Sequence, residues 1–228
     1  MADEEPTAAA RLRTPRAAAV AGILFALLLG LALVLIIVSV PTDPATAGSW
    51  LTDPARRGAL AVALNLVPFA GIAFLWFIGV VRDRIGQLED RFFASVFLGS
   101  GLLFVAMLFV GAAFAGGIAA ELIAGTSPDP NTLDISRQIT TLLLRLYAMR
   151  MAAVFTMSAA TILLRTRVGP RWIGMLGVAV GVVLLISVGL TLWVTLLFPA
   201  WILLLSVDIL RHGLRRSGTA VGAVADGA

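Results

Sequence analysis

The chain contains an uncharged apolar run of 24 residues, Ala17 to Val40, which constrains its fold more than any other feature. A helix rises about 1.5 Å per residue, so this run is long enough to cross a hydrocarbon core of about 30 Å. A signal peptide is the rival interpretation, because Ala45-Thr46-Ala47 has the small-x-small form of a cleavage site. The apolar region of a signal peptide, however, is only about 7–15 residues long. We therefore predict a retained first transmembrane helix.

Composition extends this prediction to the whole chain. Of the 228 residues, 60% are hydrophobic and 13% are charged, whereas soluble domains average about 25% charged residues. The absence of cysteine excludes disulfides, thiolate catalysis and cysteine metal sites. The only histidine, His212, has no second metal ligand near it in sequence. We expect no cofactor and no metal site. We also expect no nucleic-acid partner, because the arginines gather at loop ends, which is typical of membrane topology.

Further apolar segments predict an all-α fold, a polytopic membrane protein with six transmembrane helices in one bundle. Asp53 before Pro54 is typical of a helix N-cap, and Asn131 with Asp134 resembles a capping box. The 39 residues from 172 to 210 carry one charge, Asp208, and are long enough for two short spans. We expect one domain over 17–210, with helices at about 17–40, 54–81, 92–120, 133–164, 171–188 and 191–210, and disordered cytoplasmic tails at 1–16 and 211–228.

Arginine placement predicts the orientation of these six spans. All seventeen basic residues are arginine, and six spans would place twelve of them on one side and three on the other, with two inside a span. Loops that remain in the cytoplasm are the ones that retain arginine and lysine. Both termini are therefore predicted to be cytoplasmic. The twelve are Arg11, Arg13, Arg16, Arg82, Arg84, Arg91, Arg165, Arg167, Arg171, Arg211, Arg215 and Arg216, and the three are Arg56, Arg57 and Arg137.

The fourth expected span is unusual because Arg145 and Arg150 interrupt it. A charge at the centre of a spanning helix costs roughly 2.5–3.5 kcal/mol on insertion scales. Counted from Arg165 at the inner boundary, Arg145 lies at the outer boundary and Arg150 about 7–8 Å inside the hydrocarbon. On an α-helix these two arginines are about 140° apart. We expect this helix to insert poorly alone and to depend on its neighbours.

A polar cluster is one hypothesis for these arginines. Asn65 lies at nearly the same height, and Tyr147 lies between the two arginines, so all four could meet if the second and fourth helices touch. The expected ligand-binding residues are therefore Arg150, Arg145, Asn65 and Tyr147. No carboxylate lies at this depth. Three alternatives remain: the arginines snorkel or bond within the bundle, they bind an anionic solute or lipid headgroup, or they contact a partner subunit.

Other motifs predict packing rather than chemistry. Gly174, Gly177 and Gly181 form a small-residue stripe that lets helix backbones approach closely, either within the chain or between protomers. The serines in the apolar segments have no histidine, lysine or aspartate at a usable spacing, so no catalytic constellation is visible. We expect the protein not to be an enzyme.

The segment Arg167 to Gly177 (RVGPRWIGMLG), followed by Phe198 to Trp201 (FPAW) and Ser206, resembles a pattern in uncharacterised six-helix membrane proteins of actinobacteria, which belong to domain-of-unknown-function families. The resemblance covers about residues 167–206. It implies six spans and a bacterial plasma membrane, and it implies no activity.

These observations give three functional hypotheses. The leading one is a small non-enzymatic integral membrane protein that acts through helix contacts, as a homo-oligomer or as an accessory to a second membrane subunit. The alternative is a transporter or channel that binds an anionic solute or lipid headgroup at Arg150 from the outer side. A membrane-embedded enzyme is the third.

Overall fold

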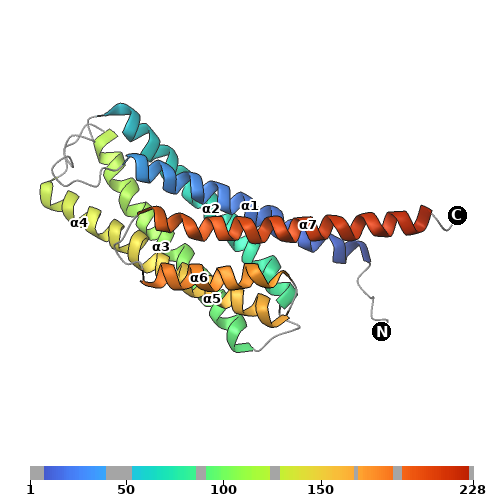
Figure 1. The fold of residues 1–228 in the computed structure, drawn as a ribbon. Helices are drawn as coiled ribbons and strands as arrows, with labels where there is room; N and C mark the ends of the chain where they lie inside the picture. Colours follow the sequence, from blue (N-terminus) through green and yellow to red (C-terminus); the bar gives the residue numbers. More distant parts are fainter. Residues whose placement is uncertain are drawn as a thin grey trace, which may run out of the picture.

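The computed structural model is built from long helices (Figure 1) and describes residues 8–39, 53–85, 91–123, 129–166, 169–186 and 192–225. Within these ranges there is no strand, so the all-α prediction is confirmed for them. The helices are α1 (Ala8–Ser39), α2 (Pro54–Ile85), α3 (Arg91–Ile123), α4 (Pro130–Thr141), the π-helix η3 (Leu142–Tyr147), α5 (Ala148–Thr166), α6 (Arg171–Ile186), the 3-10 helix η4 (Leu192–Leu196) and α7 (Leu197–Ala225).

Five helical segments are long and apolar enough to cross a membrane, which supports a membrane protein. They cover Ala17–Val38, Pro54–Arg82, Phe92–Glu121, Ile135–Thr166 and Trp193–Arg211. The sixth apolar helix, α6, has 16 residues and is therefore about 24 Å long. It is shorter than the hydrocarbon core of about 30 Å.

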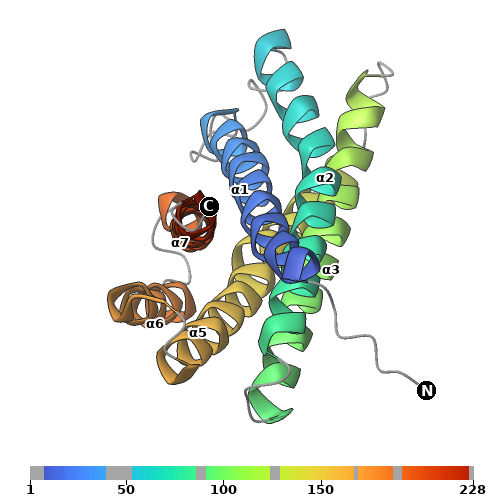
Figure 2. The same ribbon diagram turned by 90° about the vertical axis from the view of Figure 1, so that its right-hand side faces the viewer.

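The helices form a closed ring in which chain neighbours pack together. In ring order, α1 packs on α2, α2 on α3, α3 on α5, α5 on α6, α6 on α7 and α7 on α1. Figure 2 shows α1 between α2 and α7, with α5 and α6 completing the other side. The start of α1 and the end of α7 lie at the same end of the bundle (Figure 1).

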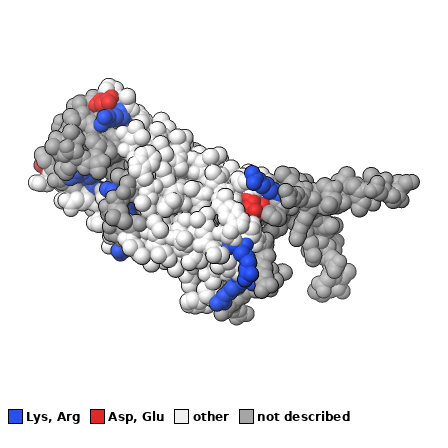
Figure 3. All heavy atoms as spheres, viewed as in Figure 1, with Lys and Arg blue, Asp and Glu red and all other residues white. Residues whose placement is uncertain are grey.

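Charged residues gather toward the two ends of the bundle on the face shown in Figure 3, with an uncharged belt between them. At one end, the Arg165 guanidinium lies 4.4 Å from the centre of the Phe93 ring, and Gly169 lies beside Asp208. At the other end, Asp53 pairs with Arg56 at 3.4 Å. An apolar belt bounded by charges is the surface expected of a membrane-spanning bundle.

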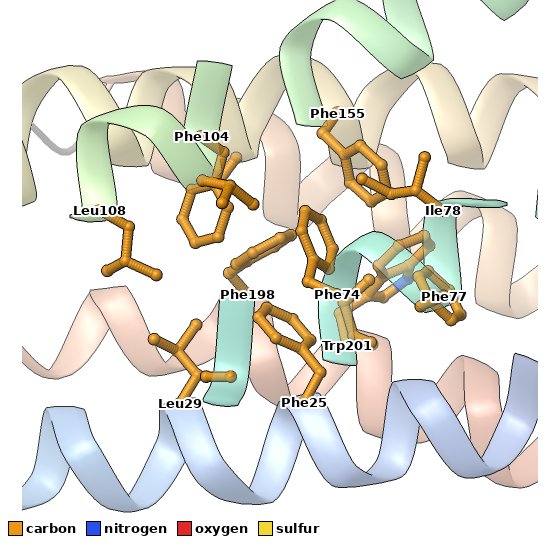
Figure 4. Close-up of a cluster of buried hydrophobic side chains, with 14 of the residues drawn as sticks. Phe25, Leu29, Phe74, Phe77, Ile78, Phe104, Leu108, Phe155, Phe198 and Trp201 are labelled. Atoms are coloured by element: carbon orange, nitrogen blue, oxygen red, sulfur yellow. The ribbon is translucent and has the colours of Figure 1, made fainter. Parts of the chain in front are cut away.

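Aromatic rings fill the centre of the bundle (Figure 4). Phe74 of α2 is fully buried and contacts rings from four other helices. These rings belong to Phe25 at 4.4 Å, Phe155 at 4.9 Å, Phe104 at 5.4 Å and Phe198 at 5.8 Å between centroids. Most of the contacts are tilted or edge-on, the geometry that the ring quadrupole favours. One cluster therefore joins α1, α2, α3, α5 and α7.

Capping residues determine where α2 and α4 begin. The cap of α2 is the predicted one, and the cap of α4 is a different residue. Asp53 Oδ1 accepts a hydrogen bond from the Ala55 amide at 2.9 Å, which confirms the predicted cap of α2. For α4 the predicted start near residue 133 and the predicted Asn131 cap are wrong. Asp129 is the N-cap, accepting from the amides of residues 131 and 132, and Pro130 is the first helical residue. Proline suits that position because its missing N–H would be unsatisfied there anyway.

The two tails differ from the prediction. Helix α1 begins at Ala8 and α7 continues to Ala225, so 8–16 and 211–225 are helical rather than disordered. The alanines, leucines and arginines of these stretches have high helix propensity. Extending an existing helix also avoids the unfavourable nucleation step. The predicted tail residues 1–7 and 226–228, and the predicted turn near residues 187–191, lie outside the described residues.

Phe74→Ala is expected to destabilise the bundle by about 3–5 kcal/mol, because it leaves a cavity at the meeting point of five helices. Thermal unfolding of the detergent-purified protein would measure the loss. Phe69→Ala is the matched control, since Phe69 lies on the same helix but is 62% exposed. Equal losses in the two variants would contradict a central role for Phe74.

Candidate functional site

The four predicted ligand-binding residues all lie on the outer surface of the bundle. Asn65 is on α2, Arg145 and Tyr147 are in η3, and Arg150 is on α5. All four side chains are exposed, Tyr147 by 49%. They do not line an interior site.

Among the described residues, no hydrogen bond joins Asn65 to Arg145 or Arg150, so the polar cluster stays a prediction. The Asn65 side-chain amide donates to the Ala61 carbonyl of its own helix at 2.8 Å. Asn65 precedes Phe74 by nine residues, which places the two on opposite faces of α2. Since Phe74 faces the centre, Asn65 faces outward. Helices α2 and α5 do touch, but through the rings of Phe74 and Phe155.

Arg150 has an unusual position on its helix. In α5 the only exposed side chains are those of Arg150 and Arg165, and the others are buried or half-buried. Among the described residues, neither Arg145 nor Arg150 has a hydrogen-bond or ion-pair partner. Both side chains are exposed on the outer surface of the bundle, where lipid or another protein could contact them.

A π-helix separates the two arginines, and the sequence analysis missed it. The Ala148 amide donates to the Leu143 carbonyl, five residues back instead of four. Residues 142–147 thus form wider turns, and the 140° separation predicted from an α-helix does not apply. Short π-helical stretches occur often at functional sites. No local residue pattern in this stretch distinguishes it from an ordinary apolar helix.

Packing gives the height of Arg145 along two helices. Counted along η3 and α5, Arg145 lies 20 residues from Arg165, or about 30 Å. Counted along α3, Gly111 lies 20 residues from Arg91, and a Cβ on Gly111 would lie 2.6 Å from Leu144. Both counts place this level one hydrocarbon thickness, about 30 Å, from the charged end. Arg150 lies one and a half turns deeper.

The helix that carries the arginines is the most enclosed of the five long spans. In its most apolar window, 56% of residues are buried, against 24–39% in the other four. This agrees with the expectation that neighbours must support its insertion. Its contacts with α3 and α6 supply that support.

Helix α6 packs closely on α5 through the three predicted glycines, so their stripe lies within the chain. Gly174 faces Leu164, Gly177 faces Ala160, and Gly181 faces Met157. These pairs define an antiparallel register. Extended by five residues, that register brings Ile186, the last residue of α6, to about the level of Arg150. The described part of α6 therefore packs on α5 up to this level.

Trp201 is a further packing residue whose role the sequence analysis did not identify. Its indole Nε1 donates to the Ile173 carbonyl at 3.1 Å, and its ring lies against Gly177. Buried tryptophans usually have such a hydrogen-bond partner. The sequence did offer one indication of this contact, since Trp201 follows the helix that carries Gly174, Gly177 and Gly181. The central phenylalanines gave no comparable signal, because membrane helices expose phenylalanine to lipid as well.

Buried hydroxyl groups in the bundle mostly bond to their own helices. Ser100 donates to the Val96 carbonyl at 2.6 Å, Thr156 to Ala152 at 2.7 Å and Ser158 to Val154 at 2.8 Å. The Ser206 hydroxyl is buried, has no hydrogen-bond partner among the described residues and lies against Gly22. Within the described ranges, no group of three or more His, Cys, Asp or Glu residues could hold a metal ion.

Comparisons with known proteins add no relative: no protein-family model, curated protein or solved structure matches the chain. The resemblance over residues 167–206 therefore stays a prediction.

Gly177→Ala is expected to destabilise the fold by about 1–3 kcal/mol, as overpacking does in a filled core. The added methyl would lie 2.6 Å from the Trp201 ring and 2.8 Å from the Ala160 Cβ. Gly79→Ala is the control, because no atom lies within 4 Å of a Cβ at that position. Thermal unfolding of both variants would measure the difference, and an unchanged Gly177→Ala would contradict the tight contact.

Proposed function

We propose that the chain is a non-enzymatic, six-span protein of a bacterial plasma membrane that acts through helix contacts on its outer surface, as a homo-oligomer or as an accessory subunit. One observation carries this proposal: the centre of the bundle is filled by the rings around Phe74. Because these rings fill the interior, the outer surface is where the bundle can make specific contacts.

The filled centre argues against the transport hypothesis. A pathway for an anionic solute needs polar groups that line a route through the bundle. Here the rings of Phe25, Phe74, Phe104, Phe155 and Phe198 occupy that position. The buried hydroxyls of Ser100, Thr156 and Ser158 are already bonded to backbone carbonyls. Arg150, the proposed solute ligand, faces outward.

The outer face of α3 suits a contact with another helix. Its long span is the least buried of the five. Small residues recur on one stripe at positions 99, 106, 113, 117 and 120, and neither Gly99 nor Gly117 has an atom within 4 Å of a Cβ position. Stripes of this kind let membrane helices approach closely. The glycines of α6, in contrast, are already used within the chain.

The topology we propose follows from arginine placement. Six spans with both termini in the cytoplasm keep twelve arginines inside and three outside, as the positive-inside rule favours. The start of α1 and the end of α7 at one end of the bundle agree with an even number of spans (Figure 1). Helix α6, at about 24 Å, would need local thinning of the bilayer or additional residues beyond Ile186.

Cysteine labelling tests this topology without interference, because the chain has no cysteine. In intact spheroplasts, a membrane-impermeant maleimide should label Thr132→Cys and should label Arg211→Cys only after lysis. Both positions are exposed at ends of helical spans. Labelling of Arg211→Cys in intact spheroplasts would indicate five spans and contradict the proposed arrangement.

Disulfide cross-linking tests the oligomer. Ala106→Cys on the α3 stripe should give a covalent dimer under mild oxidation in membranes, since the same surface meets itself in a twofold dimer. Phe69→Cys on α2 is the control, because it is exposed and lies at a similar height, about 20 Å from the charged end. If neither variant cross-links and the purified protein is a monomer without a second polypeptide, the proposal fails.

A further inference from the structure

Arg145 and Arg150 place two positive charges on the outer surface of an otherwise apolar span. Both are exposed, and neither is bonded to a described residue. Tyr147, 49% exposed, lies between them in sequence. Tyrosine with arginine is a combination typical of the membrane–water interface.

The level of these residues points to the outer headgroups. Arg145 lies about one hydrocarbon thickness from the inner charged end, by the counts along both α5 and α3. Arg150 lies 15 residues from Arg165, or about 22 Å, and therefore about 8 Å inside the hydrocarbon. A guanidinium at this depth extends toward the interface and draws polar groups inward.

No carboxylate of the chain lies within the apolar spans at the depth of Arg150. Between Ile135 and Val207 the sequence has no Asp or Glu, and the apolar cores of the other spans have none. A second copy would therefore bring no acid to this depth. Phosphate groups, in contrast, are present at the outer headgroup level in every phospholipid bilayer.

Guanidinium groups suit a phosphate partner. Each presents a planar fork of donors that matches two phosphate oxygens, and such charge-assisted bonds are the stronger kind. By the glycine register, Ile186, the last residue of α6, lies at about the level of Arg150. Two positive charges favour a lipid with net negative charge.

We infer that Arg145 and Arg150, with Tyr147 between them, form a binding site for the phosphate of an anionic phospholipid in the outer leaflet. The inference rests on the six-span membrane topology of the proposed function and is independent of the oligomer. The topology labelling described above tests that premise separately, so failure of the lipid site can be told apart from failure of the topology.

Native mass spectrometry of the detergent-purified full chain, titrated with phosphatidylglycerol or phosphatidylcholine, tests the site. The wild type should retain phosphatidylglycerol in preference to phosphatidylcholine. Arg150→Gln and Arg145→Gln should each weaken phosphatidylglycerol binding about fivefold, and the double variant about 30-fold, since a basic residue near an anionic headgroup contributes about 1 kcal/mol. Arg150→Lys, which keeps the charge, should lose less than Arg150→Gln.

Arg56→Gln is the matched control. Arg56 is an exposed arginine at the same end of the bundle, but it is paired with Asp53, and its replacement should leave phosphatidylglycerol binding unchanged. Inorganic phosphate at millimolar concentration should not displace the lipid, because it lacks the acyl chains that place the headgroup.

Three outcomes would overturn the inference. Equal binding of both lipids by the wild type, or unchanged binding in the double variant, would show that no such site exists. Displacement by inorganic phosphate would assign the arginines to a soluble anion. Co-purification of a second polypeptide that is lost in Arg150→Gln, with lipid binding unchanged, would assign Arg150 to a protein partner.

Discussion

The packing of Phe74 against rings from four other helices is the interaction on which the bundle depends. Lipid tails are as apolar as phenylalanine, so membrane helices gain little from the hydrophobic effect when they associate. Close packing and ring geometry must hold them together. Phe74 and its neighbours supply ring contacts at one central level. Gly177 of α6 lets that helix pack directly against Ala160 of α5 and Trp201 of α7.

A filled centre determines where polar residues can lie. Buried hydroxyls have to bond to their own backbones, as Thr156 and Ser158 do. The arginines of the fourth span cannot enter the ring cluster and therefore face outward. The same packing that stabilises the fold thus moves the chemically distinctive groups to the surface, which is why both the proposed helix contacts and the inferred lipid site are surface properties.

The fourth span combines costly residues with extensive support. Ten Leu, Ile, Val or Phe side chains between Ile139 and Leu164 contribute about −4 to −5 kcal/mol to insertion, and two central arginines would cancel that total. The structure encloses this span more than any other long span. Phe155, which lies five residues from Arg150, joins it to the central cluster. Neighbouring helices therefore compensate for its polar surface.

The sequence by itself determined the all-helical, apolar class of the protein and the start of α2 at its Asp53 cap. Runs of apolar residues longer than a bilayer requires, and caps such as Asp53 before Pro54, act locally and can be counted. Only the tertiary structure decided which faces turn inward. Residue counts place Asn65 and Arg150 at similar heights, but they could meet only if α2 and α5 packed through those faces, and the two helices touch through Phe74 and Phe155. The central role of Phe74 was hidden for the same reason, since its ring contacts join segments far apart in the chain.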